Sequence, residues 1–397
     1  MKIDAVKCWL VEGSKYNWTL VKVFTDEGLT GIGEATNWPG SPMVLAACEH
    51  VANVVRGEDA TRIDYIWTKL YRDMNYLGRG GPLMSAISAI DIALWDIAGK
   101  RAGMPVYELL GGAYRKRIQL YANYWFLSDL ASYPAPTSAE PGSSQFYADC
   151  ARHMASQGFT ACKFDPFAHV NYRYGDDLAT NGALTEPQKR LALERLTVVS
   201  EALGPEFPIA VETHALLNGP TAVEMAHRIA ATGLNCMWYE EPAGPEFPDA
   251  IAEIKRQISL PVCVGERLHS RYMCRPILDL HAADFLMPDV ARCGGISELR
   301  KIATLCECYN IPIAPHNPNG PISTIASAHA MAATPNFFRQ EFMMMDVPWR
   351  DTAMDSPLPV RDGYFELSDA PGLGFDLLEP ELERHPGVVS QRAGFYV

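Results

Sequence analysis

Five acidic side chains and one histidine follow short apolar runs in the second half of the chain. The residues are Glu212, Glu240, Glu266, Asp289, His316 and Glu341. They lie about 25 residues apart, which leaves room for one strand, one helix and two short loops, the repeat of a β/α unit. Apolar runs of four or five residues are typical of parallel strands buried on both faces. We therefore expect these polar side chains to meet at one end of a parallel sheet.

The three glutamates of this series, Glu212, Glu240 and Glu266, end three successive predicted strands. Neighbouring strands lie about 4.8 Å apart, so the three carboxylates can converge on one point. Converging carboxylates repel one another unless a cation lies between them. Ligand sets made only of oxygen favour Mg²⁺, which keeps open positions for water or substrate. The sequence therefore predicts a magnesium site.

Two histidines are candidate acid/base groups beside this site. A carboxylate such as Asp289 fixes the tautomer of a neighbouring imidazole and raises its basicity, which predicts that His316 is a general base. His214 lies two residues after Glu212. If it lies at the mouth of the barrel, it faces the site from the opposite side and could be a general acid; otherwise it is a surface loop residue.

Four further residues are candidate substrate contacts. Lys163 ends a predicted strand and could bind or polarise a carboxylate, and Asp165 follows it. Glu341 could hydrogen-bond to a substrate oxygen. Arg267 could bind substrate or pair with neighbouring carboxylates. A metal flanked by acid and base groups suits proton abstraction from the carbon next to a carboxylate, because the metal stabilises the enediolate that forms.

The strands that position these residues predict a (β/α)8 barrel, whose chemistry lies at the carboxyl ends of the strands. At 397 residues the chain is long enough for a barrel and a second module,. Residues 2–36 alternate as three antiparallel strands, and helical patterns follow over 42–55, 60–76 and 82–102. We therefore predict an α+β capping domain over 1–115, a catalytic barrel over 116–355, and a segment over 356–397 that contains a strand at 361–367 and folds back on the capping domain.

Two long loops, 128–144 and 165–184, follow the first two predicted barrel strands. Loops of this length are often lids, and His169, Tyr172 and Arg173 are possible lid contacts,. Substrate choice is expected to depend on these loops and on two capping-domain segments, Lys15–Trp18 and Asn75–Gly81.

Composition limits the partners and the compartment. The net charge of −13 argues against nucleic acid or an anionic membrane as a partner,. The ten cysteines include no Cys-x-x-Cys pair, which indicates free thiols in a reducing cytoplasm,. The N-terminus has no signal-peptide core, and we expect no apolar run long enough to span a membrane.

Several short motifs occur along the chain. They are Ala89-Ile90-Asp91-Ile92-Ala93-Leu94-Trp95-Asp96, Tyr239-Glu240-Glu241-Pro242, Val264-Gly265-Glu266, Met287-Pro288-Asp289, Cys293-Gly294-Gly295 and Pro315-His316-Asn317. At these motifs the chain resembles the enolase superfamily, in its mandelate racemase subgroup. The resemblance covers nearly the whole chain and implies an α+β capping domain, a modified barrel, Mg²⁺ held by the three glutamates, an Asp289–His316 base and a homo-oligomer.

Two departures from that subgroup narrow the expectation. Many members carry Lys-x-Lys on the second strand, whereas this chain has Lys163-Phe164-Asp165, so the second base of a two-base racemase is missing. At the position of Glu212, Asp is commoner. Lys-x-Asp followed by Glu-x-His is similar to acid-sugar dehydratases of the D-galactonate dehydratase kind, which implies that His214 expels the 3-hydroxyl. We therefore expect dehydration of an aldonate-type sugar acid to a 2-keto-3-deoxy acid. The alternatives are a cycloisomerase or epimerase on a related acid and a non-catalytic binding protein.

Overall fold

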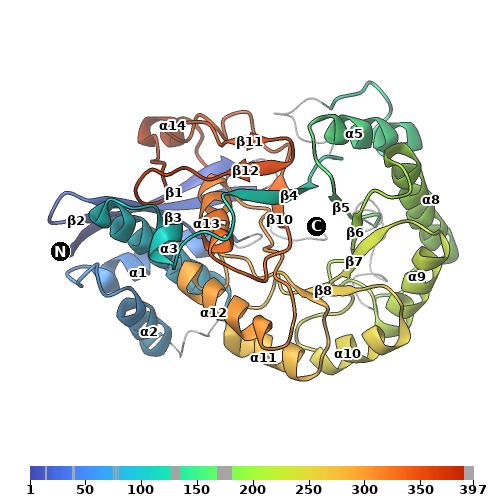
Figure 1. The fold of residues 1–397 in the computed structure, drawn as a ribbon, viewed down its shortest axis with the longest axis horizontal. Coiled ribbons are helices and arrows are strands. Elements are labelled where there is room, and N and C mark those ends of the chain that lie inside the picture. The colour runs from blue at the N-terminus through green and yellow to red at the C-terminus, as the bar shows by residue number, and fades with distance from the viewer. Residues whose placement is uncertain are drawn as a thin grey trace.

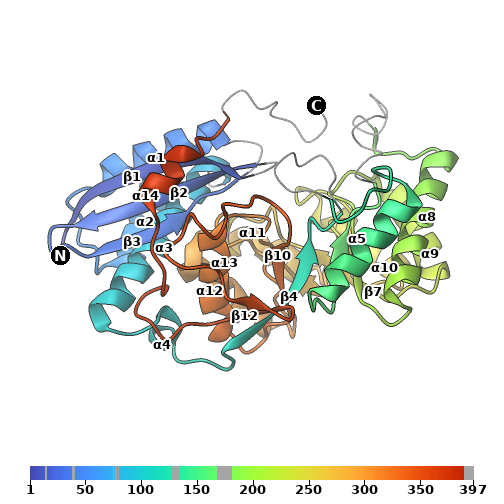
Figure 2. The ribbon, with the colours of Figure 1, turned by 90° about the horizontal axis from the view of Figure 1, so that it is seen from above.

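The structure is a computed structural model that describes residues 1–13, 16–37, 41–74, 76, 78, 80–126, 135–167 and 181–388. A ring of parallel strands is surrounded by helices, and an α+β domain lies against one side of that ring (Figures 1 and 2). The predicted fold class, a modified barrel with a capping domain, is confirmed.

The capping domain is a three-stranded antiparallel sheet covered by helices. Helix α3 packs on β3, where a Cβ at Gly31 or Gly33 would lie about 2 Å from the backbone oxygens of Ala93 and Ala89. Only glycine permits this approach of helix and strand. The elements are β1 Ile3–Gly13, β2 Tyr16–Thr25, β3 Thr30–Glu34, α1 Ser41–Val55, α2 Ile63–Asp73, α3 Gly81–Ala102 and α4 Val106–Leu109.

Helix α3 is long and apolar enough to cross a membrane by length and composition alone, contrary to the expectation that no such run exists. In the fold, 72% of its apolar window is buried inside the protein. Its burial is that of a core helix between the capping sheet and the barrel. There the Asp91 carboxylate accepts a hydrogen bond from the Ser297 backbone N–H of helix α12 (Gly295–Glu307) at 2.9 Å.

The barrel strands run parallel, and the last, β10, pairs with the first, β4. Between β9 and β10 only isolated bridges at Ile313 continue the sheet. Helices pack around the outside of the strands (Figure 1). The strands are β4 Arg117–Asn123, β5 Cys162–Phe164, β6 Ile209–Glu212, β7 Cys236–Glu240, β8 Val262–Val264, β9 Phe285–Leu286 and β10 Gln340–Met343; the other helices of this domain are α5 Ser144–Ser156, α8 Glu186–Leu203, α9 Gly219–Ala231, α10 Pro248–Gln257, α11 Arg271–Asp279 and α13 Pro321–Ala332.

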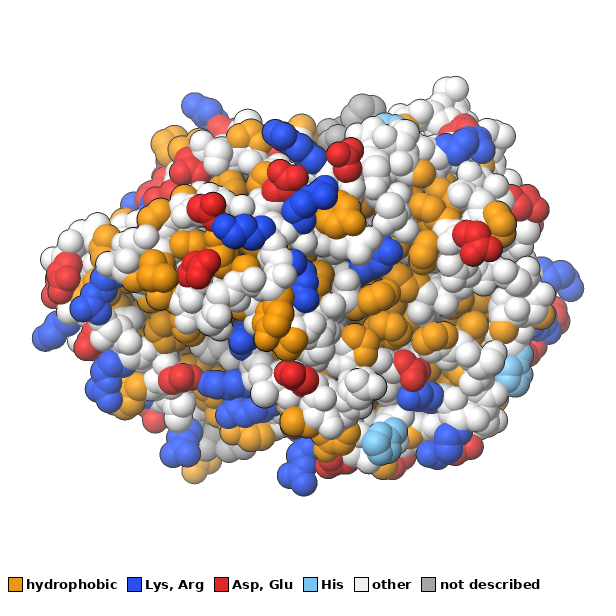
Figure 3. Space-filling view, in the orientation of Figure 1, with side chains coloured by type: hydrophobic (Ala, Val, Ile, Leu, Met, Phe, Trp, Pro, Cys, Tyr) orange, Lys and Arg blue, Asp and Glu red, His pale blue; other side chains and the backbone are white. Residues whose placement is uncertain are grey.

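The barrel face seen in Figure 1 is apolar at its centre. Figure 3 shows hydrophobic side chains gathered within the ring of strands and charged side chains scattered over the surrounding elements. Met237, near the beginning of β7, belongs to the apolar cluster inside the barrel, and Phe285, the first residue of β9, packs against that cluster. The charged strand-end residues therefore lie at the opposite, carboxyl ends of the strands.

The C-terminal segment differs from the prediction of one strand over 361–367. It forms a hairpin of β11 (Val360–Arg361) and β12 (Tyr364–Glu366), because Asp362 and Gly363 both have positive φ and turn the chain,. Strand β12 pairs antiparallel with β4 and so extends the barrel sheet. Further on, helix α14 (Glu379–Arg384) lies beside the capping sheet, where Lys7 contacts Glu379 at 2.8 Å.

Candidate metal and acid/base site

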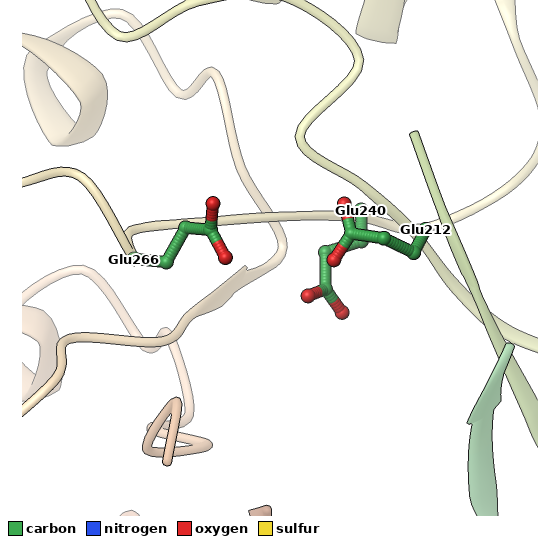
Figure 4. A group of neighbouring side chains, drawn as sticks. All are labelled: Glu212, Glu240 and Glu266. Carbon is green, nitrogen blue, oxygen red and sulfur yellow. The ribbon is translucent and has the colours of Figure 1, made fainter. Parts of the chain in front are cut away.

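Three buried carboxylates meet at the carboxyl ends of β6, β7 and β8. Glu212 and Glu240 are paired in register at the ends of neighbouring strands, and Glu266 follows β8 after Gly265. Figure 4 shows Glu212 and Glu240 side by side, with Glu266 facing them. One oxygen from each lies within 4.8 Å of the others. We call these three residues the glutamate triad.

The chemistry of the triad fits a divalent cation. Burial and the charge of Glu212 raise the pKa of Glu240 well above its ordinary value, even with a lysine nearby. Oε2 of Glu212 is buried, and the Lys163 ammonium lies 3.3 Å from it without making a hydrogen bond. A buried carboxylate oxygen without a hydrogen bond is costly, and a cation coordinated by all three residues would offset that cost. The triad could therefore hold a metal ion.

Lys163 lies within this cluster of carboxylates. Its Nζ is 2.7 Å from Glu240, 2.9 Å from Glu341 and 3.3 Å from Glu212, and the residue is 3% exposed. Burial alone would lower the pKa of Lys163, but the attraction of the three carboxylates outweighs burial and raises it well above its ordinary value. The predicted substrate contact is thus a buried ammonium that balances the charge of the site.

His316 lies on one side of the triad, paired with Asp289. Its Nδ1 is 2.8 Å from Asp289 Oδ2, and its Nε2 is 2.9 Å from Glu266 Oε2. Burial opposes protonation of the ring, but Glu341 and Glu266 raise the pKa of His316 to about 9. Because Asp289 fixes Nδ1, Nε2 is the ring atom on the side of the triad.

His214 lies on the other side, paired with Asp165. Its Nδ1 is 2.9 Å from Asp165 Oδ2 and 4.0 Å from Glu212 Oε1. The backbone at His214 has a φ of 50°, and its N–H donates to Glu212 Oε1 at 2.6 Å. The turn after β6 therefore fixes His214 to a triad carboxylate through the backbone. The structure brings together His214 and Asp165, which follow different strands.

Arg267 pairs with protein carboxylates, one of the two roles open from the sequence. Its guanidinium lies 2.9 Å from Glu241 and 3.0 Å from Glu266, and it donates to the backbone oxygen of His214 at 3.0 Å. Burial opposes ionisation of Glu266, but Arg267 and His316 hold its pKa well below the ordinary value. Arg267 thus links Glu266 to the turn that carries His214.

Residues that the sequence analysis did not select hold the predicted ones in place. Asn123 donates to Glu341 Oε1 at 2.6 Å, and Trp238 donates to Glu240 Oε2 at 2.7 Å. Asn123 ends β4, so the rule that selected the other strand-end residues would also have found it. The possible lid residues His169, Tyr172 and Arg173 lie outside the described residues, as do 128–134 and 168–180 of the two long loops, Lys15 and Asn75.

Comparisons with known proteins agree with this architecture. Residues 145–381 match the "Enolase C-terminal domain-like" family, and residues 10–111 match the "Mandelate racemase / muconate lactonizing enzyme, N-terminal domain" family.

Among similar proteins, a D-xylonate dehydratase of Haloferax volcanii is 33% identical, over 97% of this chain and 89% of its own length. A D-galactarolactone cycloisomerase of Agrobacterium fabrum is 30% identical, over 90% of this chain and 88% of its own. The crystal structure of a mandelate racemase/muconate lactonizing enzyme-like protein from Rubrobacter xylanophilus has a TM-score of 0.86 at 33% identity and covers 100% of this chain and 99% of its own. The chain therefore belongs to the enolase superfamily of enzymes, and within it to the mandelate racemase/muconate lactonizing enzyme family.

Proposed function

We propose that the protein is a Mg²⁺-dependent dehydratase that converts an aldonate-type sugar acid to a 2-keto-3-deoxy acid. The observation that carries this proposal is the pair of histidine–carboxylate contacts on the two sides of the glutamate triad. His316 with Asp289 and His214 with Asp165 have the same Nδ1-to-carboxylate geometry, at 2.8 and 2.9 Å. Elimination of water requires one group that removes a proton and another that delivers one, and the two histidines lie on the two sides of the triad.

The triad and its neighbours would bind and activate the sugar acid. When bound, Mg²⁺ supplies positive charge that stabilises the enediolate and neutralises the carboxylates around His316. Glu341, held by Asn123 and by the Asn317 backbone N–H at 2.8 Å, would contact a substrate oxygen. Direct substrate contacts of Lys163, Asp165 and Arg267 remain predictions. Their protein partners support a role in positioning the carboxylates and His214.

The proton transfers follow from the two histidines. Nε2 of His316 takes the C2 proton, and the electron pair of the broken C2–H bond passes into the enediolate. His214 gives a proton to the 3-hydroxyl, so that the C3–O bond breaks and water leaves. The resulting enol tautomerises to the 2-keto-3-deoxy acid. Asp165 stabilises the ring of His214 in the orientation that allows this transfer.

A cycloisomerase or epimerase is the second candidate, because a relative at 30% identity is named a cycloisomerase. It would share the proton abstraction by His316 and differ in the fate of the enediolate. A two-base racemase fits the site less well, because Asp165, where many relatives carry a second lysine, is paired with His214. We also propose a homo-oligomer that works in the cytoplasm, and the ten unpaired cysteines support a reducing compartment,.

The test is NMR of a panel of sugar acids with enzyme and Mg²⁺ in D₂O, with a chelator as the control. We expect one acid to lose its 3-hydroxyl and give a 2-keto-3-deoxy product, and the chelator to stop the reaction. Deuterium at C2 with the 3-hydroxyl retained would favour the second candidate. If no aldonate in the panel shows either change, the proposed function is contradicted.

A further inference from the structure

Asn319 holds the carboxylate that orients His316. Its Nδ2 lies 2.9 Å from Asp289 Oδ1 and 2.9 Å from Asp289 Oδ2. The competing side chain, Arg292, has its Nε at 3.3 Å from Asp289 Oδ2 and makes no hydrogen bond through that atom. The shorter contact therefore comes from the neutral amide. With Oδ1 also accepting from the Ala291 N–H at 2.9 Å, the plane of the carboxylate is fixed,.

Asn319 is itself held from both of its ends. Its side-chain Nδ2 also lies 3.2 Å from Ser323 Oγ, and its backbone oxygen accepts a hydrogen bond from Arg350 at 2.7 Å. Arg350 donates through Nε to Asp346 at 2.7 Å. All of these side chains are buried, so each contact is shielded from water,.

The capping domain supports the same segment. Glu34, the last residue of β3, is fully buried and accepts hydrogen bonds from the backbone N–H groups of Gly320 at 2.6 Å and Ser323 at 2.8 Å. A Cβ at Gly320 would lie 2.8 Å from Glu34 Oε1, so glycine lets the chain approach this closely. The capping-domain glutamate therefore fixes the start of helix α13, directly after Asn319.

We propose that Asn319 is a positioning residue for the base, which acts on His316 through Asp289 and is seated by Glu34 of the capping domain. This inference rests on the proposed function, because it assigns His316 the proton abstraction. Loss of the amide donor would let the Asp289 carboxylate rotate and misdirect Nε2 of His316. Misplacement of a reacting group by about 1 Å can cost about 100-fold in rate. The capping domain thus takes part in aligning the base.

The decisive variant is Asn319→Leu, which keeps the side-chain volume, removes the donor to Asp289 and also removes the Oδ1 that accepts from Arg292 at 3.4 Å. We expect kcat to fall about 100-fold with KM little changed, and the kinetic isotope effect of a C2-deuterated substrate to increase, because proton abstraction becomes the slow step. Ser323→Ala keeps the N–H that binds Glu34 and should give a smaller loss. The matched control is Asn336→Leu, which loses two hydrogen bonds to the backbone oxygens of Ala303 and Ile311, away from the triad.

A purely structural role for Asn319 predicts that both leucine variants lose stability and neither changes the isotope effect, and that result would overturn the inference. A second measurement needs no substrate. The Nδ1 proton resonance of His316, identified by its absence in His316→Asn, should shift in Asn319→Leu and stay in place in Asn336→Leu. If the wild-type protein acts on no acid, the proposed function fails, while this resonance still decides whether Asn319 orients the dyad. An unchanged resonance in Asn319→Leu would contradict the positioning role.

Discussion

The two sides of the glutamate triad are built differently. His316 is 3% exposed, and its partner Asp289 is fixed by donors from Asn319 and Ala291. The side chain of His214 is 20% exposed, and its Nδ1 lies 2.9 Å from Asp165 and 4.0 Å from Glu212. The base side, His316 with Asp289, is therefore a buried network of side chains. The acid side, His214 with Asp165, is a turn near the surface of the site.

The turn at His214 also has a backbone cost that the base side lacks. His214 and Ala215 both have positive φ, which costs non-glycine residues about 1–2 kcal/mol each,. The Glu212 carboxylate and the Glu241 backbone oxygen offset that cost by accepting hydrogen bonds from the N–H groups of His214 and Ala215. The position of the acid is thus coupled to a candidate metal ligand through the backbone. We infer from this difference that the orientation of the base, His316, is set by its neighbours before any ligand binds. The orientation of the acid, His214, depends on the position of the Glu212 carboxylate.

The largest effect should follow from breaking the base side. Replacing His316 with Asn removes the only proton acceptor proposed for C2, and we expect dehydration and C2 deuterium exchange to fall together by about 10⁴-fold. NMR of the substrate in D₂O measures both reactions. Normal turnover by His316→Asn would show that the base lies elsewhere.

Replacing the proposed general acid, His214, should separate dehydration from C2 deuterium exchange. In His214→Asn we expect C2 exchange to continue, since His316 and Asp289 are untouched, and dehydration to fall by about 10²–10³-fold. The same NMR experiment compares the rate of deuterium entry with the rate of product formation. Equal loss of both rates would mean that the two sides do not act independently.

The sequence predicted the side chains that end regular strands, because their spacing follows the β/α repeat. Glu212 and Glu240 lie in register as that repeat requires. The capping sheet was predictable for a similar reason, since alternation over residues 2–36 reports one buried face.

The contacts that cross between distant segments were not predictable. Glu34 and Gly320 lie 286 residues apart in the chain and meet only because the capping domain packs on the barrel. Asn319 has no periodic pattern that would select it, and the partners of Lys163 and Arg267 depend on which way long side chains bend inside the barrel. The hairpin at Asp362-Gly363 is different, because Asp-Gly between two apolar runs is a recognised turn pattern and was missed.

A second buried histidine, outside the site, sharpens the comparison and should give the smallest effect. His329, on helix α13, is 1% exposed; its Nδ1 accepts from the Tyr107 N–H at 3.3 Å, and its Nε2 donates to the Leu373 carbonyl at 3.2 Å. Burial lowers the pKa of His329 to about 4, whereas the carboxylates around His316 raise the pKa of that histidine to about 9. Equal burial thus gives opposite shifts, depending on the neighbouring charges.

The two shifts have opposite signs for stability. As pH falls from about 6.5 to about 4, the unfolded chain binds a proton at residue 329 that the folded protein does not, so the free energy of unfolding decreases by roughly 3 kcal/mol. His329→Gln should lack this decrease, and urea unfolding of both proteins across that pH range measures the difference. In the metal-free protein the contribution of His316 is instead complete below about 6.5 and is lost as pH rises through 9,. Parallel stability curves for wild type and His329→Gln would show that residue 329 is not kept neutral by burial, and would contradict the opposite shifts of the two histidines.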